Sequence, residues 1–197
     1  MLKVAVLVSG GGTNLQALID AKNKGRIKNG ELTLVISSKL GVFALKRAEK
    51  AGIATAVVER KAFASAEEFD SALLSVLHKN NIDVIVLAGF LSVLGKNVIV
   101  AYPNKIINVH PSLIPSFCGK GFYGLRVHEE ALKKGVKVTG ATVHFVDEIP
   151  DGGEIILQKA VDVLPNDTAE TLQKRVMEEA EWLLLPLALE MLCNGEI

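Results

Sequence analysis

Short apolar runs alternate with amphipathic segments through the first half of the chain. The apolar runs are nearly uninterrupted and rich in β-branched residues, which is typical of parallel strands buried on both faces. The intervening segments place apolar residues three or four positions apart, as an amphipathic helix does. This alternation predicts an α/β fold, an open twisted sheet that is mostly parallel and has helices on both faces. We expect strands at 4–8, 32–36, 55–58 and 84–88, and helices at 14–22, 43–51 and 66–80.

The second half of the chain has a different pattern. A fifth strand is expected at 105–109, and the runs 138–146 and 154–163 are expected to form an antiparallel pair late in the chain. Between the fifth strand and this pair lies segment 111–125, rich in glycine, proline and aromatic residues and without an obvious element. Compact domains seldom keep such a loop without a functional reason.

The chain ends in a predicted amphipathic helix. Asp167-Thr-Ala-Glu170 has the pattern of a capping box, which marks a helix start. Pro186 lies within the apolar pattern that follows, so we expect it to kink the helix or to restart it at a new first turn. No repeat or linker interrupts the chain, and we expect residues 1–197 to form a single domain.

Composition and charge limit the classes of partner. Of the 197 residues, 49% are hydrophobic, and 22 basic side chains balance 22 acidic ones, so the formal net charge is zero. A field that attracts nucleic acid or an anionic membrane is therefore not expected, and small molecules are the expected partners. The only cysteines, Cys118 and Cys193, support no disulfide framework. With no apolar run near the roughly twenty residues that span a bilayer, the sequence predicts a cytoplasmic protein.

A glycine-rich segment, Ser9-Gly-Gly-Gly-Thr-Asn14, separates the first strand from the first helix. Glycine lets the backbone approach a ligand closely, and the free N–H groups of the helix N-terminus attract an anion. The alternative is a tight turn in which Thr13 caps the helix. The segment lacks the Lys-Ser/Thr ending of a P-loop and the spacing of a dinucleotide loop, so a monophosphate is the favoured ligand.

Three residues point to chemistry at a carbonyl carbon. Asn108 and His110 lie two positions apart on the fifth strand, so their side chains share a face. Asn108 is suited to donate to a developing oxyanion, and His110 titrates near neutral pH. Asp151, flanked by Gly152 and Gly153, is suited to hold an imidazolium and to accept a proton.

Other polar residues have weaker functional interpretations. Cys118 invites a Cys–His nucleophile, but no helix N-terminus is evident to lower its pKa. The four side chains His110, His128, His144 and Asp151 show no metal-ligand spacing, so we expect no metal. His144 either supports the reacting groups or is a satisfied core residue, and Thr142, on its strand face, is a candidate for holding a water. The aromatic cluster of Phe117, Phe122 and Tyr123 is either a lid or simple packing.

Taken together, the motifs resemble those of the folate-dependent glycinamide ribonucleotide formyltransferases of purine synthesis. The resemblance extends over essentially the full length, in order and spacing. It rests on the segments Ser9-Gly-Gly-Gly-Thr-Asn-Leu-Gln, Leu87-Ala-Gly-Phe-Leu, Asn108-Val-His-Pro-Ser-Leu-Ile-Pro, Gly140-Ala-Thr-Val-His-Phe-Val and Asp151-Gly-Gly.

The resemblance implies a Rossmann-like formyltransferase fold and direct transfer of a formyl group from 10-formyltetrahydrofolate, the co-substrate, to the glycinamide amine. It implies that Asn108 binds the formyl oxygen, that His110 stabilises the tetrahedral intermediate as its cation, and that Asp151 orients His110 and assists proton transfer. From their shared strand face, we also expect His144 and Thr142 to lie behind these groups. Further implied contacts are the substrate phosphate on Gly12, Thr13 and Asn14, the ribose on Glu181, and the folate on Leu91, Ser92, Val93, Leu94, Asn108 and Asp147.

Three positions depart from the pattern of the family. Ser92 and Ala66 stand where an arginine is often found or expected, and Arg60 or Lys61 are candidate substitutes. Trp182 stands where histidine is usual, in a late helix one residue longer than the commonest pattern. The extra residue leaves Glu178 and Glu179 as alternatives to Glu181 for the ribose.

Other functions remain as alternatives. A formyltetrahydrofolate hydrolase would use the same amide, imidazole and carboxylate but has no need of a phosphate loop, and relatives of that kind carry an additional N-terminal domain. A transfer-RNA formyltransferase needs a C-terminal domain and a basic surface, which the chain does not show. A nucleotide-binding regulator has no use for Asn108, His110 and Asp151 together. The sequence leaves open whether the protein is a monomer or a homodimer.

Overall fold

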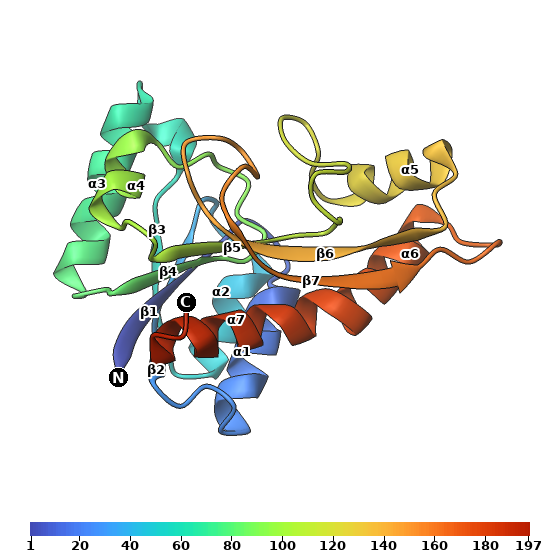
Figure 1. Ribbon diagram of the computed structural model, residues 1–197. Coiled ribbons are helices and arrows are strands. Elements are labelled where there is room, and N and C mark those ends of the chain that lie inside the picture. Colours follow the sequence, from blue (N-terminus) through green and yellow to red (C-terminus); the bar gives the residue numbers. More distant parts are fainter.

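The computed structural model describes residues 1–197 and contains one seven-stranded sheet with helices on both faces (Figure 1). The strand order is β3-β2-β1-β4-β5-β6-β7; pairs up to β4–β5 are parallel, and β5–β6 and β6–β7 are antiparallel. The α/β fold expected from the apolar runs is confirmed. In chain order the elements are β1 (Leu2–Val8), α1 (Thr13–Asn23), β2 (Gly30–Ser37), α2 (Phe43–Lys50), β3 (Ala54–Val57), a 3₁₀ turn (Arg60–Ala62), α3 (Ala66–Lys79), β4 (Val84–Leu87), α4 (Lys96–Ala101), β5 (Ile106–His110), α5 (Leu125–Lys134), β6 (Val138–Phe145), β7 (Ile155–Asp162), α6 (Ala169–Val176), a π-helical turn (Met177–Glu181) and α7 (Trp182–Asn194).

Side-chain alternation along the central strands divides the core into two layers. In β1, Val4, Val6 and Val8 join a cluster that includes buried residues of α1, α2, α6 and α7. Ala5 and Leu7 face the other way, into a smaller cluster with α3 and α4. Because both faces of β1 are covered, its sequence is apolar at every position from Val4 to Val8. Figure 1 shows α1, α2 and α7 on one side of the sheet and α3 and α4 on the other.

The chain reverses its direction of travel across the sheet at β1. From β1 it winds outward to β2 and β3, then crosses back to β4 on the other side of β1. In open parallel sheets such a reversal leaves a crevice at the carboxyl ends of the two neighbouring strands. The glycine segment follows β1 at this edge, and Asn108 and His110 lie at the end of β5 on the same side.

The last helix is continuous but irregular. A π-helical turn, Met177–Glu181, joins α6 to α7, and the flanking residues Val176 and Trp182 keep right-handed helical dihedrals. One π-turn holds one residue more than an α-turn, so a helix that contains this turn takes up one residue more than a regular α-helix with the same number of turns. Regular α-helix resumes at Trp182, four residues before Pro186. Pro186, where we expected a kink or a new helix start, lies inside α7.

Two helices were not expected from the sequence. α4 has only six residues, three of them the β-branched Val98, Ile99 and Val100, so its helix signal is weak. α5 begins at Leu125, which the sequence assigned to the preceding loop, and the rest of that loop contains no helix or strand. None of the helices combines the length and apolar character needed to cross a bilayer.

Candidate active site

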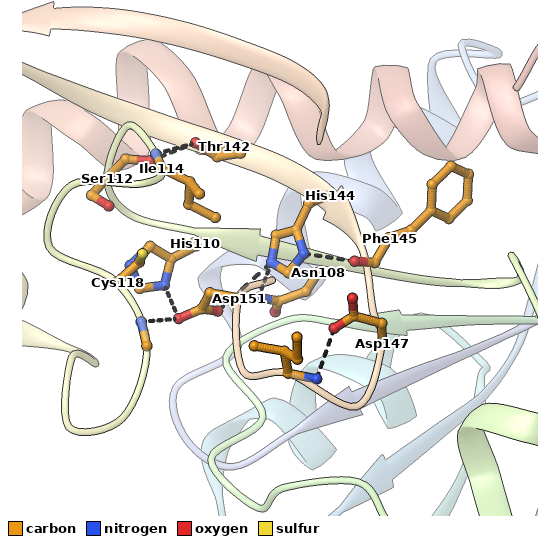
Figure 2. Close-up of polar contacts among 12 residues, drawn as sticks. Asn108, His110, Ser112, Ile114, Cys118, Thr142, His144, Phe145, Asp147 and Asp151 are labelled. Carbon is orange, nitrogen blue, oxygen red and sulfur yellow. Dashed lines mark hydrogen bonds and ion pairs between the residues drawn. The ribbon is translucent and has the colours of Figure 1, made fainter. Parts of the chain in front are cut away.

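Asn108 and His110 lie side by side at the end of β5, as their spacing predicts. In the antiparallel pairing with β6, Asn108 is opposite His144 and His110 is opposite Thr142, so four polar side chains gather on one face. Asp151 joins them from the β6–β7 loop, where its φ of 57° turns the chain back toward the sheet. Figure 2 shows Asn108, His110 and His144 close to Asp151, whereas Thr142 lies farther away, beside Ser112 and Ile114.

His110 is buried, with 4% of its surface exposed, and both ring nitrogens face acceptors. Nε2 donates to the carbonyl oxygen of Phe117 at 2.9 Å, and Nδ1 lies 3.5 Å from Oδ2 of Asp151. Burial lowers the pKa of His110, while the charge of Asp151 and the bond to Phe117 raise it; the net direction is downward. A proton gained at Nδ1 would therefore meet a carboxylate already in place.

Asp151 is held in its ionised form. Oδ2 accepts the backbone N–H of Gly119 at 2.8 Å, and Oδ1 lies 3.7 Å from Nε2 of His144. Burial alone would raise the pKa of Asp151, but the contacts with His144, His110 and Gly119 outweigh it and the pKa is lowered. At neutral pH the carboxylate is thus available as a counter-charge for His110.

His144 determines which way the Asn108 amide faces. Nδ1 of His144 lies 2.7 Å from the carbonyl oxygen of Phe145, an acceptor only, so Nδ1 carries the proton. In neutral His144, Nε2 is then an acceptor, and it takes a hydrogen bond from Nδ2 of Asn108 at 3.1 Å. One N–H of the Asn108 amide is used in this bond, and the second is left to donate elsewhere.

Thr142 fastens the loop that follows β5. Its hydroxyl donates to the carbonyl oxygen of Ser112 at 2.7 Å and accepts from Ile114 N–H at 3.0 Å and from Gln158 Nε2 at 2.9 Å. These bonds use the one donor and both lone pairs of the hydroxyl. Thr142 therefore has no capacity left for the water that it was a candidate to hold, and it positions residues 112–114 instead. Gln158, which the sequence analysis missed, stands opposite Thr142 on β7.

The same loop contains the cysteine and the aromatic cluster considered above. Burial and the charge of Asp151 raise the pKa of Cys118, which disfavours a thiolate nucleophile. The rings of Phe117 and Phe122 pack against each other with centroids 6.3 Å apart, while Tyr123 is exposed. Because the Phe117 carbonyl and the Gly119 N–H bind His110 and Asp151, the loop is tied to these residues by its backbone.

The glycine segment ends at the start of α1. Gly12, with φ of 73°, is the N-cap residue and Thr13 is the first residue of the helix, so the alternative in which Thr13 is the cap is wrong. The Thr13 hydroxyl contacts Met177 Sδ at 3.7 Å. Asn14 is buried, its Nδ2 donates to Oε2 of Glu181 at 2.7 Å, and its Oδ1 has no partner.

Glu181 is the late-helix carboxylate that reaches the site. It is 6% exposed, whereas Glu178 and Glu179 are exposed and Glu178 pairs with Lys174 at 3.8 Å. Burial raises the pKa of Glu181 to about 7, and the bond from Asn14 opposes only part of this rise. A carboxyl buried with one amide as its only partner is costly unless a ligand supplies further hydrogen bonds.

A cavity of about 130 Å³ adjoins Asn108 and Asp151. Of the expected folate contacts, Ser92, Val93, Leu94 and Asp147 line it together with Asn108, but Leu91 does not. Instead, the Leu91 N–H donates to Oγ of the buried Ser9 at 2.8 Å, a link between two loops that the sequence did not reveal.

The proposed substitutes for the missing arginines lie elsewhere. Arg60 donates to the Phe63 carbonyl and lies over the Phe69 ring at 5.9 Å, and neither Arg60 nor Lys61 lines the small cavity. A larger surface cavity, of about 890 Å³, lies between α1 and α7. It includes Thr13 but none of the residues on β5, so it is separate from the cluster in Figure 2.

Comparison with known proteins agrees with this arrangement. A model of the formyl transferase family matches residues 2–189. The chain belongs to the formyl transferase family. It is 39% identical over 197 residues to phosphoribosylglycinamide formyltransferase of Haemophilus influenzae. The match covers 100% of this chain and 90% of that protein. It is 46% identical over 196 residues to the trifunctional purine biosynthetic protein adenosine-3 of Gallus gallus, of which it spans only 19%.

Solved structures confirm the formyltransferase fold. Glycinamide ribonucleotide transformylase 1 from Symbiobacterium toebii matches 99% of this chain and 89% of its own, with a TM-score of 0.92 and 41% identity. Phosphoribosylglycinamide formyltransferase from Bacillus halodurans matches 99% of this chain and 97% of its own, with a TM-score of 0.90 and 35% identity. The family expected from the motifs is therefore confirmed.

Proposed function

We propose that this protein transfers the formyl group of 10-formyltetrahydrofolate to the amine of N1-(5-phospho-β-D-ribosyl)glycinamide, a step of purine biosynthesis. The convergence of Asn108, His110 and Asp151 at one edge of the sheet carries the proposal. A phosphate-type loop and the buried Glu181 lie at the same edge and suit a ribonucleotide substrate. Relatives that match the whole chain bear the name of this activity.

The proposed reaction begins with attack of the substrate amine on the formyl carbon. The carbonyl oxygen gains negative charge and accepts the free N–H of Asn108, whose other N–H is held by His144. His110, protonated at Nδ1 against Asp151, stabilises this charge. The attacking nitrogen loses a proton, directly or through water, to Asp151, and the bond from carbon to N10 of the folate breaks as N10 gains a proton from His110. The proton on Asp151 then passes to Nδ1 of His110, 3.5 Å away, which restores both groups.

The remaining residues are assigned to binding. The backbone N–H groups at Gly12, Thr13 and Asn14 would receive the phosphate at the N-terminus of α1. Glu181 would accept from the ribose hydroxyls, which supplies the hydrogen bonds that its buried carboxyl lacks. The folate pterin would occupy the cavity lined by Ser92, Val93, Leu94 and Asp147.

A turnover assay tests the proposal directly. Loss of 10-formyltetrahydrofolate is followed with and without glycinamide ribonucleotide, and the formylated ribonucleotide is identified by mass spectrometry. We expect loss of the donor only when the ribonucleotide is present. Equal loss without it would instead support a formyltetrahydrofolate hydrolase, and no loss under either condition would refute formyl transfer from this donor.

A further inference from the structure

Helix α2 holds two carbonyl groups of the glycine segment. The N–H of Ala44 donates to the carbonyl oxygen of Gly10 at 3.2 Å, and Nε of Arg47 donates to the carbonyl oxygen of Gly11 at 2.9 Å. In a trans peptide the carbonyl of one residue and the N–H of the next point in opposite directions. The N–H groups of Gly11 and Gly12 therefore point away from α2, and neither donates to a backbone acceptor.

Arg47 is itself held in place. Its Nη1 donates to Oε1 of Gln16 at 2.9 Å, and its guanidinium carbon lies 4.8 Å from the centre of the Phe43 ring. The contact with the loop leaves no spare room, since a Cβ at Gly12 would lie 2.7 Å from Ala44 Cβ and 3.4 Å from Arg47 Cδ. Three separate contacts thus fix the guanidinium against the segment that precedes α1.

The charge of Arg47 is not neutralised by a neighbour. No carboxylate lies within ion-pair distance of its guanidinium, although Arg175 forms such a pair with Asp167. Two of the five N–H donors of the guanidinium are used, on Gly11 and Gln16, so donors and a full positive charge remain beside the segment. The positive charge of Arg47, which belongs to α2 and not to the glycine segment, favours binding of an anion by that segment.

We propose that Arg47 is a positioning residue for the substrate phosphate. It fixes the Gly11 carbonyl so that the following N–H faces the phosphate, and it adds an unpaired positive charge next to the helix N-terminus. The inference rests on the proposed function for the identity of the substrate, but not for the presence of an anion site. We expect Arg47 to affect binding of the ribonucleotide and not the chemical step, because the residues proposed to act on the formyl carbon lie at the end of β5, on a different segment.

Two variants and a matched control test this role. Arg47→Met removes the charge and the bond to Gly11 while keeping an unbranched side chain, and Arg47→Lys restores the charge without the planar fork. Lys46→Met removes a positive charge from the neighbouring position of α2, which is exposed. Calorimetry gives the Kd of glycinamide ribonucleotide and of the folate, and single-turnover kinetics with saturating substrates give the transfer rate.

We expect Arg47→Met to raise the Kd of the ribonucleotide about tenfold to a hundredfold, the range for lost hydrogen bonds to a charged group. The folate Kd and the transfer rate should stay within about twofold, Arg47→Lys should fall between wild type and Arg47→Met, and Lys46→Met should match wild type. An unchanged ribonucleotide Kd in Arg47→Met would overturn the proposal. So would an equal rise in both Kd values with a lowered Tm, which would show a merely structural role.

Inorganic phosphate separates this inference from the proposed function. Its binding is followed by ³¹P NMR line broadening with wild type, Arg47→Met and Lys46→Met. If the turnover assay fails but phosphate binds wild type and Lys46→Met and not Arg47→Met, the positioning role stands and the proposed substrate is wrong. If phosphate binds Arg47→Met as well as wild type, the role of Arg47 is refuted whatever the turnover assay shows.

Discussion

At the scale of single residues, a neighbour of each reacting side chain determines where that side chain carries its hydrogens. His144 does this for the Asn108 amide, and Asp151 does it for the His110 ring. His144 fixes the amide of Asn108, so that one N–H of Asn108 is free to meet an oxyanion. We expect Asn108→Ala to lower the transfer rate about a hundredfold to a thousandfold, as for other single oxyanion donors. Single-turnover kinetics measures this rate, and calorimetry should show ribonucleotide binding unchanged. A rate within tenfold of wild type would remove Asn108 from the mechanism.

The carboxylate of Asp151 opposes the effect of burial on His110. Burial lowers the pKa of His110 and the charge of Asp151 raises it, so Asp151→Asn should lower the pKa of His110 further. Because less imidazolium is then present at neutral pH, turnover should fall about a hundredfold to ten-thousandfold. An NMR titration of the His110 ring measures the pKa. A pKa that stays or rises in the variant would contradict the assigned role of Asp151.

Glu181 should make the free enzyme less stable as the pH rises. Its pKa in the folded protein, about 7, lies above the ordinary value of 4.5, so the folded state binds more protons between these values. The free energy of unfolding therefore falls as pH rises through this window, and Glu181→Gln removes the effect. We expect the variant to be more stable than wild type at pH 8, by up to about 3 kcal/mol, and equal to it near pH 4.

Urea denaturation at the two pH values measures this difference, and ribonucleotide affinity serves as the second readout. The glutamine should weaken ribonucleotide binding, since an amide oxygen accepts from the ribose hydroxyls less strongly than a carboxylate. A variant less stable than wild type at pH 8 would show that the Glu181 carboxyl stabilises the fold. A Glu181→Gln variant that is more stable than wild type and binds the ribonucleotide more weakly would show that the buried carboxyl destabilises the free protein and serves ligand binding.

At the scale of elements, Glu181 reaches Asn14 from the end of the π-helical turn, which takes up one residue more than an α-turn. Deleting the exposed Glu179 should convert the π-helical turn to regular α-helix, while α6 and α7 keep their present packing contacts. We expect the Tm to change by only a few degrees. Deleting the buried Ala188 of α7 is the control, because every later apolar side chain would then rotate off the core. Equal losses of Tm in both deletions would contradict this account.

The elements differ in how far the sequence predicts them. The buried strands β1 and β4 could be predicted from their apolar runs. Both faces of these strands are covered, so nearly every position is buried and apolar. α4 has only six residues, three of them β-branched, so no local pattern marks it. α5, by contrast, is amphipathic, has lysines in its last turn and ends at Gly135, and these are signals that the sequence analysis missed. Asn108, His110 and Asp151 could be chosen from their chemistry. Their supports could not, since the pairing of Asn108 with His144 depends on the β5–β6 register, which only the folded sheet sets.

At the scale of the molecule, the candidate site joins segments far apart in the chain. The start of α1 meets the π-helical turn through Asn14 and Glu181, and the loop after β1 meets the loop after β4 through Ser9 and Leu91. The β5–α5 loop is tied to the β6–β7 loop through Gly119 and Asp151. A ligand that bridges the carboxyl ends of the strands therefore contacts several segments that are distant in the chain, and its binding energy adds to the stability of the fold.

The ribonucleotide should accordingly raise the Tm, and Asn14 should control that rise. At a hundredfold excess over its Kd a ligand adds about 2.7 kcal/mol to stability, which corresponds to about 5–10 °C for a chain of this size. In Asn14→Leu the ribonucleotide should produce little shift, while a folate that fits the cavity beside Asn108 should still shift the Tm as in wild type. Hydrogen exchange should show protection at the start of α1 and at the π-helical turn in wild type alone. A full ribonucleotide shift in Asn14→Leu would refute the phosphate assignment, and loss of both shifts would mean that Asn14 supports the fold, not one substrate.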